Sequence, residues 1–404
     1  MWKYILPGIA LIGVTYAFAR FSFGLFLPQI TESLRLSDSE AGMIGSSAYL
    51  AYTLALASAA FFIKQYQANR VIFWAGFTAV IGLFVMAIAP NFTVLLSAVF
   101  IAGLGSGWAS PAYAQIVSER LSDKQADRGN TWINSGTSFG LIISGPIALF
   151  FTEYWRVAFL LFAAMALIAL IWNRHTLNQH SEKRSKRDNS KEKGSGSAVL
   201  ARAKSIILAA LLVGVSTSIY WTFSRSFLTV EYEWTTFASI VFWVLMGVSG
   251  VVGGLSGGII NQFGLSLSYR LTLVFLISSI FLLTVSNVLA VFSSAILFGS
   301  MYIFMTGLFI VWSARLFNDN PSIGVSLSFL ALGLGQTLGS FAGGYVIEMW
   351  SYQAPLSCLP VLVSLDSSYQ LCEKGIKLDP FALLFFWHES SLDRYHFQLS
   401  QKSK

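Results

Sequence analysis

Long apolar stretches alternate with short polar breaks along most of this chain. Eleven stretches before residue 350 reach the ~20 apolar residues that a helix needs to cross a lipid bilayer. The pattern therefore predicts an all-α polytopic membrane protein. The expected spans lie near residues 4–29, 41–63, 71–89, 92–117, 130–152, 156–173, 204–229, 237–260, 269–286, 289–312 and 322–347.

A long polar stretch divides these spans into six before it and five after it. It combines a basic run at 181–187 with a Gly/Ser-rich run at 194–197, and such a sequence cannot bury enough apolar surface to fold alone. We predict an N-terminal six-helix bundle at 1–173, a basic linker at 174–203 and a C-terminal bundle at 204–354. The linker is expected to be a solvated connector, with binding to anionic lipid as the alternative.

Composition and charge agree with a membrane protein and orient it. Hydrophobic residues make up 55% of the 404 positions and charged residues 11%, and the mean hydropathy is +0.65. With a cytoplasmic N-terminus, 17 Lys and Arg of the spans and their loops lie inside and two, Arg35 and Arg156, lie outside. This bias predicts a multi-pass protein of the bacterial cytoplasmic membrane. It also accounts for the net charge of +7 without a nucleic-acid partner.

One arginine lies inside an apolar span in each half of the chain. Arg20 follows Phe18-Ala19, and Arg225 follows Phe223-Ser224, 205 residues later. A guanidinium at membrane depth costs roughly 3 kcal/mol or more, so it is kept where it meets a partner, a substrate or water. Because the predicted spans hold no Asp or Glu at midplane depth, we expect both arginines to face one central cavity and share an anion. The alternative is a structural or gating role for each arginine.

Small residues recur at every fourth position in spans 2, 5, 8 and 11. This spacing places each set on one helical face, where two backbones can approach closely. Its recurrence in every third span favours an interface between two bundles over generic packing. The predicted interface residues are Ser47, Ala51, Ala55, Ala59, Gly136, Gly140, Ser144, Ala148, Gly250, Gly254, Gly258, Gly335, Gly339 and Gly343.

Six short motifs stand out along the spans, at residues 16–21, 27–28, 103–107, 145–146, 155–159 and 335–336. Together they resemble motifs of the major facilitator superfamily, nearest its YbfB/YjiJ-type bacterial branch. The resemblance covers residues 1 to about 350 and implies the major facilitator fold, with two pseudo-symmetric six-helix bundles. Spans 1, 4, 7 and 10 would line the cavity, and span 2 would meet 11 as 5 meets 8. The chain departs from the family at 64–65 and 261–262, where the acids of the usual loop signature are absent.

Polar and aromatic side chains in the spans supply candidate substrate contacts. Tyr16 and Trp221 lie four residues before the two arginines, on the same helical faces. The other candidates have helix–helix contacts as their alternative role. The chain has neither a phosphate-binding loop nor clustered His and Cys, so we expect no enzyme, no metal site and no cofactor. The candidate substrate-binding residues are Arg20, Arg225, Tyr16, Trp221, Trp132, Asn134 and Gln336.

The twelfth span that the resemblance implies is apparently lost. Residues 355–404 hold 10 charged residues in 50 positions, against 35 in the preceding 354, and Pro355 and Pro360 interrupt the stretch where the span should run. The apolar run at 381–387 is too short to cross a bilayer. We interpret the tail as the product of a frameshift or sequence error near Ala354, with a genuinely divergent tail as the alternative.

These features favour a monomeric secondary transporter that moves a small solute by alternating access. The paired arginines make an organic or phosphorylated anion the expected substrate, and the lipid bilayer is the other expected partner. The alternative is a non-transporting membrane protein, either a sensor-like relative or the inactive product of a frameshifted transporter gene.

Overall fold

The computed structural model describes residues 1–178, 196–253, 256–317 and 321–356. Within these ranges, eleven helical spans are long and apolar enough to cross a membrane, as the sequence predicts. The described part of the chain contains no strand, so the protein is an all-α multi-pass membrane protein. The predicted loss of a twelfth span concerns the tail, and the tail from residue 357 onward lies outside the described residues.

The first span consists of three continuous elements, α1 (Trp2–Ile12), η1 (Gly13–Phe21) and α2 (Ser22–Leu34). The fifth span is formed by the end of α6 together with α7. The remaining elements are α3 (Asp38–Tyr66), α4 (Ala68–Ile88), α5 (Phe92–Arg120), α6 (Asp123–Asn134), α7 (Gly136–Phe151), α8 (Trp155–Asn178), α9 (Gly196–Val230), α10 (Thr236–Gly253), α11 (Ser256–Phe263), α12 (Leu265–Leu283), α13 (Val288–Leu316) and α14 (Pro321–Met349).

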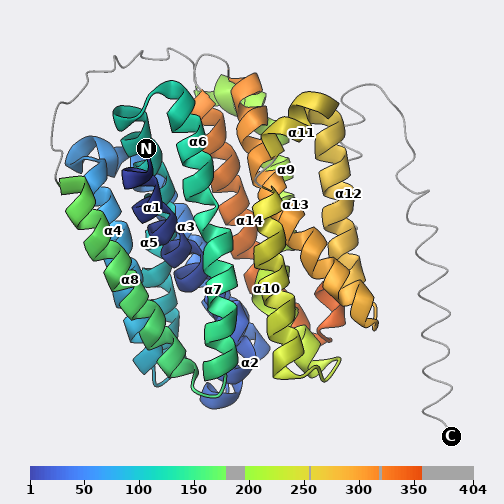
Figure 1. Ribbon diagram of the computed structural model, residues 1–404. Helices are drawn as coiled ribbons and strands as arrows, with labels where there is room; N and C mark the ends of the chain where they lie inside the picture. Colours follow the sequence, from blue (N-terminus) through green and yellow to red (C-terminus); the bar gives the residue numbers. More distant parts are fainter. Residues whose placement is uncertain (179–195, 254–255, 318–320, 357–404) are drawn as a thin grey trace, which may run out of the picture.

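The first and seventh spans lie at the centre of the molecule, surrounded by the others (Figure 1). Their most apolar windows are 83% and 72% buried, whereas those of the other nine spans described are 39–50% buried. The outer helices leave large apolar side chains such as Phe77 and Ile168 exposed, as expected where a helix faces lipid. The two spans that carry the buried arginines are therefore the two most enclosed by protein.

The helices before the linker (the first half) meet those after it (the second half) along two pairs of helices, α3 with α14 and α7 with α10. At the first contact, Ser46 donates a hydrogen bond to the carbonyl of Thr337 at 2.9 Å, and Ser340 donates to the carbonyl of Gly42 at 3.2 Å. At the second, the backbone of Ile142 lies against Gly247. These are the helix pairs that the sequence predicts.

The small-residue stripes, however, do not face each other across that interface, and this prediction was wrong. Gly335 and Gly339 lie against the backbone of α9, within their own half, and Gly136 and Gly140 lie against α1 and η1. The stripe on α3 packs on α5, and only Gly250 contacts the other half, through Ser138, while Gly254 lies outside the described residues. Small residues at a spacing of four predict that a helix packs closely against another, but each of these helices has a neighbour in its own half and one in the other half. The small residues face the neighbour in their own half, which lies closer.

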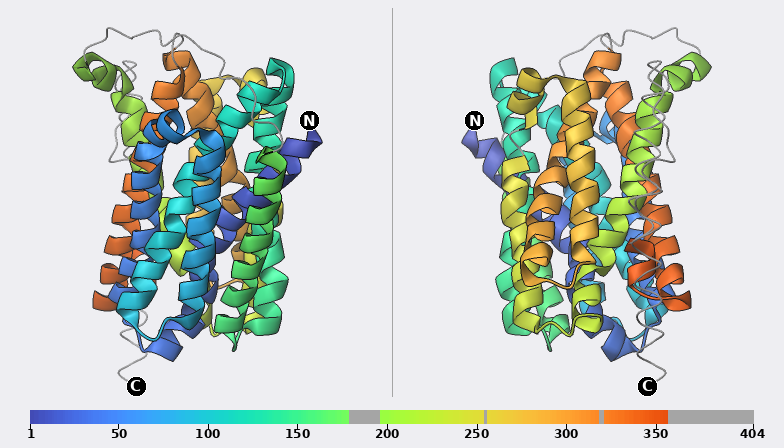
Figure 2. Two further views of the ribbon diagram at one scale, coloured as in Figure 1. Left: turned by 90° about the vertical axis from the view of Figure 1, so that its left-hand side faces the viewer. Right: turned by 90° about the vertical axis from the view of Figure 1, so that its right-hand side faces the viewer.

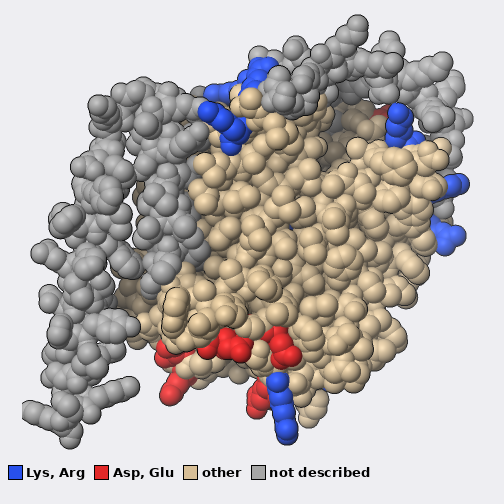
Figure 3. All heavy atoms as spheres, turned by 180° about the vertical axis from the view of Figure 1, so that it is seen from behind, with Lys and Arg blue, Asp and Glu red and all other residues tan. Residues whose placement is uncertain are grey.

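The two ends of the molecule differ in charge (Figure 3). The N-terminus, the end of α8 and the start of α9 lie at one end, which we call the linker end (Figures 1 and 2). The opposite, distal end carries the α2–α3 connection. Lys and Arg gather at the linker end and Asp and Glu mainly at the distal end, with an uncharged band between them (Figure 3).

Contacts between the halves concentrate in the distal part of the molecule. The backbone N–H of Ser39 donates to Glu348 at 2.8 Å, and the Tyr352 hydroxyl donates to Asp38 at 2.5 Å. Burial by these contacts and the neighbouring carboxylate raise the pKa of Tyr352. Toward the linker end, Leu54, Ala57 and Ala60 of α3 are exposed. The structure is therefore closed at the distal end.

Candidate functional site

Arg20 is a buried cation surrounded by aromatic rings. Its guanidinium carbon lies 4.0 Å from the ring centre of Tyr52, 5.0 Å from that of Tyr49, 5.1 Å from that of Phe21 and 5.7 Å from that of Tyr16. Each desolvated cation–π contact stabilises the charge by up to about 2 kcal/mol. The rings thus replace part of the hydration that Arg20 loses, with no carboxylate involved.

A π-helical segment of the first span holds Arg20 and Tyr16. It runs from Gly13 to Phe21, where backbone bonds of the i→i+5 type widen the helix. The hydroxyl of Thr15 donates to the carbonyl of Leu11 at 2.9 Å, so a side chain helps to satisfy the backbone where the bonding pattern changes. Such segments are rare and are frequent at functional sites.

Arg20 also connects the two halves of the protein. Its Nη2 donates to the amide oxygen of Gln336 on α14, and the Gln336 amide nitrogen donates to the Tyr302 hydroxyl on α13 at 3.2 Å. The Nε of Arg20 is buried without a hydrogen-bond partner. A neutral amide is a weaker acceptor for a guanidinium than a carboxylate is. The site therefore holds a cation whose partners are all neutral, at the contact between the halves.

Arg225 has a different environment, nearer the distal end. Its Nε donates to Ser239 at 3.2 Å, and its Nη1 donates to the carbonyl of Leu25 and, at 2.8 Å, to the side chain of Gln29. Two of these three acceptors belong to α2, in the first half. Arg225 is fully buried and therefore joins α9 to α2 where the distal end is closed.

The two arginines share no hydrogen-bond acceptor. Leu25 and Gln29 lie five and nine residues beyond Arg20 on the first span, a rise of roughly 7–13 Å in an α-helix. No Asp or Glu forms an ion pair with Arg20 or Arg225 among the described residues. Glu153 interacts with Arg225 by longer-range electrostatic attraction. The idea that both guanidinia share one anion stays a prediction.

Trp221 lies between the two arginine environments. Its ring stacks on Phe21 with centroids 4.5 Å apart, and it contacts Tyr302 at 5.5 Å and Trp243 at 5.7 Å. A Cβ added at Gly24 would lie 2.1 Å from the Trp221 carbonyl, so α2 and α9 approach as closely there as glycine permits. Trp221 thus packs against the Arg20 site through Phe21 and Tyr302.

Two other candidate residues lie on α6, away from Arg20. The ring of Trp132 contacts that of Trp2, with centroids 5.6 Å apart. Asn134 is exposed and accepts a hydrogen bond from Ser110 at 3.3 Å. The structure therefore brings together Arg20, Tyr16, Trp221 and Gln336.

Sequence reasoning missed several residues that contact the arginines. Tyr49 and Tyr52 are the clearest case, since two tyrosines three residues apart in an apolar span share a helical face. Gln29 and Ser239 carried no comparable signal, because isolated polar residues near span ends are common. The missed residues that contact an arginine are Tyr49, Tyr52, Gln29 and Ser239, and two further missed residues, Tyr302 and Trp243, contact Gln336 and Trp221.

Comparison with known proteins gives a consistent result. The family model described as Major Facilitator Superfamily matches residues 9–321. The hexuronate transporter of Bacillus subtilis (strain 168) is 29% identical over 172 residues, which cover 40% of this chain and only 39% of that transporter.

Solved structures of transporters share the fold. A POT family transporter in complex with 5-aminolevulinic acid has a TM-score of 0.75 at 14% identity, over 93% of this chain and 96% of that one. The nucleoside transporter NupG has a TM-score of 0.70 at 15% identity, over 91% and 99% of the two chains. At such identities the likeness concerns the fold alone.

Proposed function

Since this chain belongs to the Major Facilitator Superfamily, and is thus a membrane transporter, we propose that it is a secondary transporter for a small carboxylated solute. The observation that carries the proposal is the environment of Arg20. A permanent charge is buried between the halves, with aromatic rings and one neutral amide as its partners. A substrate carboxylate would provide the charged acceptor that the protein does not supply.

The aromatic rings around Arg20 suit a sugar acid. Flat faces of Tyr52 and Tyr16 can cover the apolar side of a sugar ring, and the amide of Gln336 can hydrogen-bond its hydroxyls. The name of the hexuronate transporter states that it carries hexuronate, a sugar with one carboxylate. We therefore propose a hexuronate or a similar sugar acid as the substrate class, ahead of phosphate esters.

Alternating access would proceed by rocking of the two halves about this site. We take residues 1–173 and 204–354 as the moving units, with 174–203 as their linker. In the structure, Arg225 and the α3–α14 contacts close the distal end. The excess of Lys and Arg at the linker end supports a cytoplasmic N-terminus, and with that orientation the closed distal end would face outward. We propose that the protein works as a monomer in the cytoplasmic membrane.

Uptake by proteoliposomes that hold the full chain tests the proposal. We expect saturable uptake of radiolabelled glucuronate that unlabelled galacturonate inhibits and glucose does not. The Arg20→Lys variant keeps the charge but loses the planar fork, so its uptake should fall about tenfold or more. Trp108→Phe is the matched control, because its indole donates to Ser58 away from the site.

Two outcomes would contradict this assignment. Equal inhibition by glucose and galacturonate would show that the carboxylate is not recognised. Absence of uptake of any sugar acid or phosphate ester by monodisperse wild-type protein would favour the alternative of a non-transporting membrane protein.

A further inference from the structure

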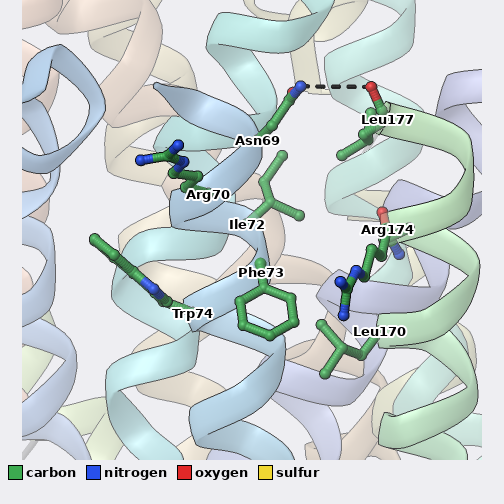
Figure 4. A pocket seen from close by; sticks show the side chains of 9 residues that line it. Asn69, Arg70, Ile72, Phe73, Trp74, Leu170, Arg174 and Leu177 are labelled. Atoms are coloured by element: carbon green, nitrogen blue, oxygen red, sulfur yellow. Dashed lines mark hydrogen bonds between the residues drawn. The ribbon is translucent and has the colours of Figure 1, made fainter. Parts of the chain in front are cut away.

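A second site lies at the linker end, between α4 and α8, on the outside of the first half. A cavity of about 300 Å³ opens there, and Figure 4 shows the side chains that line it. Ligand pockets range from about 300 to 1,000 Å³, so this one suits a small polar group rather than a whole drug-sized molecule. The central Arg20 site is not part of it.

The lining of this cavity is basic. Arg174 is exposed, lies over the ring of Phe73 with its guanidinium carbon 5.6 Å from the ring centre, and turns toward Leu170 (Figure 4). Arg70 lies on the opposite flank of α4 (Figure 4). No Asp or Glu is among the described residues that line the cavity. The charge of the pocket therefore fits a phosphate group.

A buried acceptor in the lining lacks a donor. Asn173 is 1% exposed, and its amide nitrogen donates to the carbonyls of Pro7 at 2.9 Å and Ala169 at 2.8 Å. These two bonds fix the orientation of the amide, and its Oδ1 has no hydrogen-bond partner. The amide therefore ties α8 to α1, and Arg174 is an exposed polar side chain of the cavity.

The surfaces next to the cavity are apolar and face outward. On α4 the exposed side chains continue from the pocket toward the distal end, and a parallel row lies on α8, which packs along α4. Such surfaces accommodate acyl chains. The exposed apolar residues are Phe77, Ile81 and Phe84 on α4 and Leu167, Ile168 and Ile171 on α8.

We propose that this site binds one anionic phospholipid, of the phosphatidylglycerol type. Its phosphate lies at Arg174, and its acyl chains follow the outer faces of α4 and α8. Basic pockets between membrane helices at the end that faces anionic lipid bind such headgroups. This inference does not depend on the transported substrate.

Native mass spectrometry of the full chain in detergent tests the proposal. Dioleoyl phosphatidylglycerol and dioleoyl phosphatidylcholine share their acyl chains, so the difference between them reports the headgroup. We expect the glycerol lipid to bind about tenfold more tightly, and Arg174→Gln to remove most of that preference. Arg174→Lys should restore part of it. Arg270→Gln, an exposed arginine of α12, is the matched control and should leave the preference within twofold.

Three results would overturn the proposal. Equal binding of the two lipids would exclude headgroup recognition, and an equal effect of Arg174→Gln and Arg270→Gln would exclude this pocket. Binding of glycerol 3-phosphate or inorganic phosphate as tight as that of the lipid would assign the pocket to a soluble phosphate compound. Because Arg174 is exposed, its substitution should not impair folding, and Arg70→Gln provides a second variant with a smaller expected effect.

Discussion

Arg20 and Arg225 lie in similar local sequences, Phe-Ala-Arg and Phe-Ser-Arg, and yet have different partners in the structure. Arg20 is surrounded by four aromatic rings and donates to one neutral side chain, Gln336. Arg225 donates to a backbone carbonyl, an amide and a hydroxyl, and two of these groups belong to the other half of the protein. Both cations have only neutral partners and one unpaired nitrogen each, Nε of Arg20 and Nη2 of Arg225, but Arg20 donates one hydrogen bond among aromatic rings whereas Arg225 donates three.

The difference suggests that the two arginines have different functions. A guanidinium held by several acceptors of the other half must release them before the distal end can open. A guanidinium in an aromatic cage can accept a carboxylate at little cost in broken bonds. We therefore assign substrate binding to Arg20 and closure of the distal end to Arg225, and the following experiments test this assignment.

The largest effect is expected from removing the charge at Arg20. Arg20→Gln should raise the KM for a hexuronate by roughly 10- to 100-fold, because each guanidinium–carboxylate contact contributes about 1.5–3 kcal/mol. Arg225→Gln should change KM less than about threefold. Proteoliposome uptake at varied substrate concentration measures both values, and equal increases in KM would show that the two arginines share the anion after all.

The next effect concerns the close contact of α2 and α9 beside Arg225. Gly24→Ala places a methyl group 2.1 Å from the Trp221 carbonyl, so the distal end should open. Overpacking costs about 1–3 kcal/mol, which corresponds to a shift of about 5- to 150-fold in the ratio of the two conformations.

A Thr222→Cys substitution reports this opening, because Thr222 is buried against Gly45 of α3. With Cys358 and Cys372 replaced by Ser, labelling of the introduced thiol by an impermeant maleimide should become about 5- to 150-fold faster in the Gly24→Ala variant. Gly8→Ala is the control, since its methyl group would meet the flexible side chain of Ile133 at the linker end. An unchanged labelling rate would refute the role of this contact in closure.

A smaller effect in the same assay is expected from Arg225→Gln. The variant loses the bonds to Leu25 and Gln29, each with a net value of about 1 kcal/mol, so labelling of the introduced thiol should rise roughly 30-fold or less. Arg20→Gln should leave that rate within about twofold in the absence of substrate. A larger response to Arg20→Gln would reverse the assignment.

The smallest effect is expected from Tyr52→Phe, which keeps the ring 4.0 Å from the guanidinium of Arg20 and removes only the hydroxyl. The KM for a hexuronate should change less than about threefold. Tyr52→Leu removes the ring and should raise KM about 3- to 30-fold, since the cation–π contact contributes about 0.5–2 kcal/mol. Equal values for the two variants would mean that the ring contributes nothing to the site.

The glycine stripes show where the sequence pattern stops being informative. A repeat of four predicts correctly that Gly335 and Gly339 make a close helix contact. It does not say which helix they contact, and the choice of α3 was wrong because α9 lies closer. The halves meet instead through Gly42, Ser46 and Ser340. Gly42 and Ser46 are also four residues apart, but they lie one residue away from the predicted stripe of α3, on a neighbouring face of the helix.

The sequence by itself determined the spans and the two buried arginines. These follow from local rules, since bilayer thickness fixes the length of a span and the cost of a buried charge makes an arginine conspicuous. The helix pairs between the halves followed from the resemblance to the family and not from the small-residue stripes. Only the tertiary structure decided what each arginine contacts. Tyr52 and Gln336 reach Arg20 from helices far away in the chain, and the π-helical turn that positions Arg20 depends on packing. The partners of a buried charge depend on how the helices pack together. A repeated local motif such as Phe-x-Arg therefore does not predict them.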